Sequence, residues 1–112
     1  MNNLQRLQLE TQGIELTHEE FRVYLAENSL NHYDEYNPNS NKSKRAIYQT
    51  ALAILESVAN NPELMKDYKQ DDMTISAFHE NLMARIDQLE RKIRTMPISD
   101  DSNDSNFFML FQ

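Results

Sequence analysis

Residues 42–60 read KSKRAIYQTALAILESVAN, and this stretch decides the fold. Its apolar side chains recur at steps of three and four residues, at Ile47, Ala51, Ile54, Leu55 and Val58. That spacing places them on one face of an α-helix, so it predicts an amphipathic helix over the whole stretch. We therefore expect this helix to form the centre of the core.

The composition of the chain is that of a helical protein with one core. Its 112 residues suit a single domain, and they include only one glycine, Gly13. Sheet-rich folds usually need several glycines for turns and bulges. Pro38, Pro62 and Pro97 each fall where a helix is expected to begin or end. We predict an all-α fold, a small helical bundle of about four helices with a disordered or extended C-terminal tail.

Two further helices are predicted before residue 42. A short one runs to about Thr11, where Gly13 ends it as a C-cap residue with positive φ. The second begins after Thr17, an N-cap residue whose capping box is completed by Glu20, and it runs to about Leu30.

A polar loop follows this second helix, because asparagine, aspartate, proline and serine are concentrated in residues 33–43. Two aromatic residues lie in it, Tyr33 and Tyr36. We expect both rings to pack against the core while their hydroxyl groups stay in water.

Two more helices are predicted after residue 60. Asn61 can cap a short helix that begins at Pro62 and runs to about residue 67. The last helix is expected over residues 75–96, with Thr74 or Ser76 as its N-cap and Pro97 as its stop signal.

The last helix carries two rows of side chains at seven-residue steps. One row is Ile75, Leu82, Leu89 and Met96, and the other is His79, Ile86 and Ile93. Such a pattern is typical of helices that pair along a seam. The partner is either the alanine-rich helix of the same chain or another copy of the chain. We favour pairing within the chain, which needs no further assumption.

No motif in the sequence predicts catalysis, a metal site or a cofactor. The histidines are His18, His32 and His79, and no two of them stand at the three- or four-residue spacing of helical metal ligands. One glycine cannot build a phosphate-binding loop. The adjacent acidic residues fall in loops or at helix starts, where carboxylates are usually solvated. We therefore expect a protein that is not an enzyme.

The charge of the chain excludes several other classes of function. A formal net charge of -7 argues against a broad nucleic-acid interface and against an anionic membrane surface. Three basic residues do cluster in NKSKR, residues 41–45, and could bind phosphate, but we favour a solvated start of a helix. The chain has no cysteine and no apolar segment long enough for a membrane span, and its first residues, MNNLQRLQLE, lack the apolar core that we would expect of a signal peptide.

The last residues of the chain form a separate region. We expect residues 1–96 to form the helical domain and residues 97–112 to form a flexible acidic linker with an apolar end. Five apolar residues stand together in that end: Phe107, Phe108, Met109, Leu110 and Phe111. They are too few to span a membrane, but they suit a groove on another protein. We predict that they form a partner-binding anchor.

Residues 46–93 resemble the small helical head-to-tail connector, or adaptor, proteins of tailed bacteriophages. In that family an alanine- and leucine-rich helix carries a core that here reads AILESVA, residues 53–59. A short capped turn follows, here NNPELMKDY, and then a polar segment, here DDMTIS. The last helix of the family has a pattern that is matched here by Leu82, Arg85, Ile86 and Leu89.

This resemblance implies a structural virion protein that forms a homo-oligomeric ring, typically a dodecamer. Such a ring docks on the portal protein, contacts neighbouring adaptor, stopper or tail subunits, and extends the DNA channel at the phage neck. DNA would pass through without sequence-specific binding, and assembly would take place in the host cytoplasm. The alternative is a small helical regulator or inhibitor that binds one protein partner through its apolar C-terminal tail.

Overall fold

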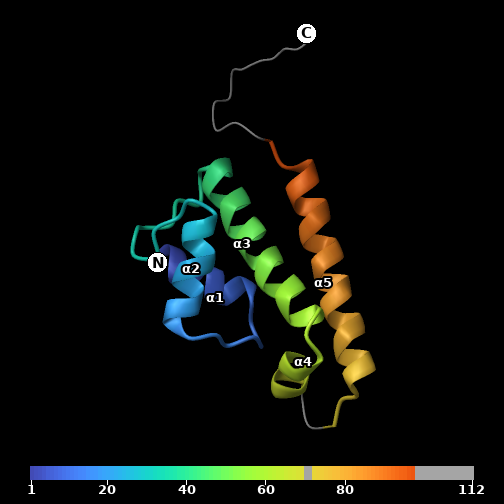
Figure 1. Cartoon of the computed structure of the whole chain (residues 1–112). Helices are drawn as coiled ribbons and strands as arrows, with labels where there is room; N and C mark the ends of the chain where they lie inside the picture. The colour runs from blue at the N-terminus through green and yellow to red at the C-terminus, as the bar shows by residue number, and fades with distance from the viewer. Residues whose placement is uncertain (70–71, 98–112) are drawn as a thin grey trace.

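The computed structural model describes residues 1–69 and 72–97 of the chain, and within them five α-helices form one bundle (Figure 1). These are α1 (Asn3–Glu10), α2 (His18–Glu27), α3 (Asn41–Ala59), α4 (Pro62–Tyr68) and α5 (Ile75–Thr95). The only β pairing in the described residues is a single antiparallel bridge between Asn2 and Glu35. The predicted all-α fold is confirmed, with five helices in place of about four, because both short helices form.

Helix α3 is the centre of the core, as its sequence predicts. It contacts each of the other four helices, and Figure 1 shows α5 beside it on one side with α1 and α2 on the other. Its buried residues include every member of the predicted stripe: Ile47, Ala51, Ile54, Leu55 and Val58. The apolar face is fully covered because the helices before and after α3 in the chain pack against different sides of it.

The seam of α5 packs against α3 of the same chain. Leu82, Ile86, Leu89 and Ile93 are buried, and the two helices run antiparallel along most of their length (Figure 1). The prediction of an intramolecular pair is confirmed. The ends of the two rows are less covered, since Ile75, His79 and Met96 are only partly buried.

The capping residues predicted from the sequence are confirmed at three helices. The Thr17 hydroxyl accepts from the Glu20 amide at 3.1 Å, and the Glu20 side chain accepts from the Thr17 amide at 2.9 Å. Asn61 caps α4, with Pro62 in its first turn, and of the two candidates for α5 it is Thr74 that caps the helix. Each of these interactions spans at most three residues, which is why the local sequence could predict them.

Helix α2 ends at Glu27, three residues earlier than predicted. Ser29 adopts a positive φ of 64° there. The Ser29 amide donates to the Ala26 carbonyl at 3.0 Å, and the Leu30 amide donates to the Leu25 carbonyl at 2.9 Å. This pair of bonds is the Schellman arrangement, which normally places glycine at the position that Ser29 occupies. The absence of that glycine explains why the end was not predicted.

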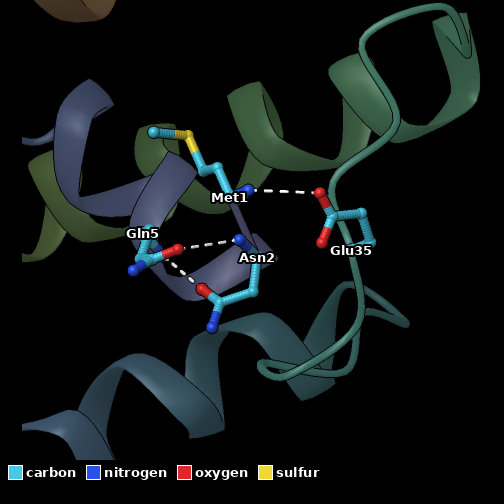
Figure 2. Close-up of polar contacts among 4 residues, drawn as sticks. All are labelled: Met1, Asn2, Gln5 and Glu35. Carbon is cyan, nitrogen blue, oxygen red and sulfur yellow. Dashed lines mark hydrogen bonds and ion pairs between the residues drawn. The ribbon is translucent and has the colours of Figure 1, made fainter.

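The N-terminal residues are fixed by contacts that the sequence did not reveal (Figure 2). Asn2 and Gln5 form a capping box at the start of α1. The Met1 amino group pairs with the Glu35 carboxylate at 3.1 Å, and the Asn3 amide donates to the Asp34 carbonyl at 2.9 Å. These contacts join the start of the chain to the loop before α3.

The other end of α1 is joined to α5. Thr11 is the C-cap residue, and Gly13, predicted to be the cap, follows two residues later with a φ of 92°. Its positive φ is confirmed, but the predicted cap position is wrong. Arg85 donates from Nη2 to the Glu10 carbonyl at 3.1 Å and from Nη1 to the Gln12 carbonyl at 3.3 Å. The guanidinium thus satisfies carbonyls that the end of α1 leaves without helical partners.

The two tyrosines of the loop before α3 behave differently. Tyr36 is partly buried against the core, and the Arg6 guanidinium lies 5.4 Å from the centre of its ring. Tyr33 is 67% exposed, so the prediction that its ring packs on the core is wrong. Its ring instead meets that of His32 edge to face, with the centroids 5.0 Å apart.

Candidate functional site

The predicted anchor residues Phe107, Phe108, Met109, Leu110 and Phe111 lie outside the described residues, as does the acidic linker before them. The structure does describe the point from which they continue. Helix α5 ends at Thr95, Met96 is its C-cap residue, and Pro97 follows. The described residues therefore include the surface at which the tail begins.

The end of α5 is held against the start of α3. The Arg45 guanidinium of α3 donates a hydrogen bond to the Ile93 carbonyl in the last turn of α5. The Lys92 ammonium lies 5.2 Å from the centre of the Tyr48 ring, a distance suited to a cation–π contact. Because both helices belong to the core, these contacts fix where residue 97 leaves the bundle.

A shallow groove lies at this end of the bundle, with a volume of about 350 Å³. Residues from both helices line it: Asn41, Lys44, Tyr48, Lys92, Thr95, Met96 and Pro97. The groove is thus built at the junction where the tail begins, and within the described part of the chain its charged lining residues are Lys44 and Lys92.

Basic residues gather around this groove. Six of the eleven in the chain lie in the first turns of α3 or the last turns of α5, and we call this set the basic end: Lys42, Lys44, Arg45, Arg91, Lys92 and Arg94. Arg91 forms an ion pair with Asp87 at 3.0 Å, while Arg45 and Lys92 make the contacts described above. Among the described residues, neither Lys44 nor Arg94 has an ion-pair partner. The basic end therefore carries excess positive charge in a chain whose net charge is -7.

The sequence predicted only part of this cluster. The run NKSKR was interpreted as a solvated start of a helix, and it does begin α3. The basic residues Lys92 and Arg94 lie in the last turn of α5, where positive charge is favourable. The two groups lie side by side because α3 and α5 are antiparallel, a relation that neither segment encodes alone.

The histidines are not brought together by the fold. His18 lies in the first turn of α2, His32 lies in the loop before α3, and His79 lies in α5. No group of three metal-ligating side chains occurs within residues 1–69 and 72–97. None of the described helices is long and apolar enough to cross a membrane.

A second groove, of about 250 Å³, lies between the α1–α2 connection and the start of α5. Tyr68 is one of its lining residues, and its hydroxyl donates to the Glu15 carbonyl at 3.2 Å. Burial raises the pKa of the Tyr68 phenol, and the nearby carboxylates of Glu20, Asp67 and Glu15 raise it further. The phenol therefore stays protonated and serves as a hydrogen-bond donor from α4 to the connection between α1 and α2.

Comparison of the chain with protein-family models, with curated proteins and with solved structures found no match in any of the three.

Proposed function

We propose that this protein is a structural component of tailed-phage virions, a head-to-tail adaptor that docks on the portal and extends the DNA channel at the neck. Its subunits would form a homo-oligomeric ring, typically of twelve copies. The apolar residues 107–111 would anchor each subunit on the portal or on a neighbouring adaptor, stopper or tail subunit. The ring would assemble in the host cytoplasm and remain in the virion.

The observation that carries the proposal is how the adaptor-like segment, residues 46–93, sits in the fold. It coincides with α3, α4 and α5, which contact one another as one unit. Leu82, Ile86 and Leu89 of the adaptor-like pattern are buried, and Arg85 of the same pattern fastens α5 to the end of α1. The residues that carry the resemblance are therefore those that shape the helical unit.

The charge and the shape of the chain also favour this proposal. Eighteen acidic residues stand against eleven basic ones, and an acidic channel wall does not retain the DNA phosphates that must slide past it. A compact helical body with a fixed exit point for its tail suits a ring, in which each subunit contacts the next through two different surfaces.

The alternative proposal is a regulator or inhibitor that binds a single protein through the same apolar residues. The observation that favours it is the run Phe107 to Phe111 itself, because an apolar groove on any one partner could bury it. The two proposals differ in oligomeric state and in location.

Negative-stain electron microscopy of the purified full chain, alone and mixed with a candidate portal ring, tests the proposal. The adaptor proposal expects rings, or an added layer on the portal. A chain that stays monomeric, even with the portal present, would refute it and leave the regulator.

Deletion of residues 106–112 tests the anchor separately. We expect helicity and the thermal midpoint to change little, because residues 4–89 of the described part of the chain already supply a continuous apolar core. Docking on the portal should be lost. A second variant replaces Phe107, Phe108 and Leu110 by serine, which removes the apolar side chains and keeps the length of the chain; it should lose docking as well. Normal docking of either variant would show that the anchor lies elsewhere.

A further inference from the structure

We propose that the basic end binds the acidic segment of its own chain, residues 100–104, and holds that segment along the groove between α3 and α5. The carboxylates would come from Asp100, Asp101 and Asp104, the next acidic residues after Pro97. This inference is independent of the proposed adaptor function.

The first argument is the excess charge at the basic end. Lys44 and Lys92 both line the groove, and Lys44 and Arg94 have no ion-pair partner among the described residues. Helices α2 and α4 have acidic residues in their first turns, whereas α3 has none there and begins with basic residues. Positive charge at a helix N-terminus is unfavourable, because it adds to the positive end of the helix dipole. A nearby anion would relieve this repulsion.

The second argument is the position of the acidic segment. Pro97 is itself a lining residue of the groove, so the chain leaves α5 inside the site. At about 3.3 Å per residue, Asp100 can lie within about 10 Å of Pro97 and Asp104 within about 23 Å. The three carboxylates can therefore reach the ammonium groups around the groove without any movement of the helices.

The third argument is the tether. Ion pairs between exposed side chains are individually weak. A short linker, however, keeps the acidic segment at an effective concentration in the millimolar range. A free acidic peptide or a second copy of the chain would have to reach such a concentration to compete, so the segment of the same chain is the favoured occupant.

The contact would limit where residues 107–111 can search for a partner. With residues 100–104 held along the groove, the apolar residues would begin close to the start of α3. The contact should weaken in salt, because it joins solvent-exposed charges.

Paramagnetic relaxation enhancement on the full chain tests the proposal. The chain has no cysteine, so Ser105→Cys provides a single site for a nitroxide spin label. We expect the label to broaden backbone amide signals in residues 41–48 of α3. The broadening should fall by about half or more when NaCl is raised from about 0.05 M to about 1 M, where the Debye length is about 3 Å.

Two sets of substitutions in the labelled chain identify the charges. Asp100→Asn with Asp101→Asn and Asp104→Asn should remove the broadening in α3. Lys44→Gln with Lys92→Gln should reduce it similarly. Lys66→Gln with Lys69→Gln, a pair of the same chemistry at α4, should leave it unchanged. Amide spectra of each variant check that the bundle stays folded.

Four outcomes would overturn the proposal. The broadening could be confined to residues 93–97, it could persist in high salt and in the Asp→Asn variant, or it could pass between chains when labelled and isotope-labelled proteins are mixed. A short duplex DNA could also displace the segment at low micromolar concentration in physiological salt, which would make the basic end a nucleic-acid site.

Discussion

Replacement of Leu55 by alanine tests the central position of α3 in the core. Leu55 is 0% exposed, and it belongs to the core that α3 forms with the helices that precede and follow it in the chain. The change removes three carbon atoms, worth about 2.4 kcal/mol at about 0.8 kcal/mol for each buried methylene. The cavity left behind adds to this loss, so we expect the free energy of unfolding to fall by about 2–5 kcal/mol.

Leu9→Ala is the matched control, since Leu9 is a helical leucine that is 49% exposed. It should cost about 1.2 kcal/mol, about half of the transfer term for Leu55, because about half of the side chain is already in water. Urea unfolding followed by far-ultraviolet circular dichroism measures both values through the midpoint and the slope of the transition. A loss under about 1 kcal/mol for Leu55→Ala, or equal losses for the two variants, would refute the assignment of the core.

Three further predictions concern single contacts. Arg85→Gln should lower the free energy of unfolding by about 1–3 kcal/mol, because it removes two hydrogen bonds to carbonyls at the end of α1. Arg94 is exposed, so Arg94→Gln should have little effect in the same urea titration. Ser29→Gly should raise the free energy of unfolding by about 0.5–1 kcal/mol, and with it the thermal midpoint, because glycine adopts the positive φ at no steric cost. Ser29→Ala should give no such gain. The pKa of Tyr68 is higher in the folded chain than its ordinary value of 10.0, so its stabilising contribution is complete below pH 10.0 and is lost as the pH rises through the folded pKa. Urea titrations in that alkaline range should show a smaller decline for Tyr68→Phe than for the parent chain, and identical declines would contradict the assigned role.

The acidic composition and the apolar residues 107–111 indicate which kinds of partner the protein can bind. They do not indicate which surface of the helical bundle lies beside the start of the tail. The sequence predicted the anchor at residues 107–111, whose structure lies outside the described residues. It also predicted the end of the last helix to within about one residue, and so the place where the tail begins. It did not predict the groove there, because residues 41–48 and residues 92–97 line it together.

The sequence by itself determined the helices and the N-caps of three of them, α2, α4 and α5. Thr17 with Glu20, and Asn61 with Pro62, act over a few residues, and the stripe of α3 repeats with the helical period. Such signals are local, so they can be read without knowing the fold. Their failures are also local, because Ser29 ends α2 in a conformation usually reserved for glycine.

Only the tertiary structure decided which distant residues meet. Arg85 reaches the carbonyls of Glu10 and Gln12, which lie 75 and 73 residues away in the chain, and Met1 pairs with Glu35. The basic end exists because α3 and α5 pack antiparallel, which brings the start of one helix to the end of the other. The apolar stripes of α3 and α5 require that the two helices pack together. Whether they run parallel or antiparallel depends on the short connection through α4. The antiparallel arrangement places the basic end at the point where the tail begins.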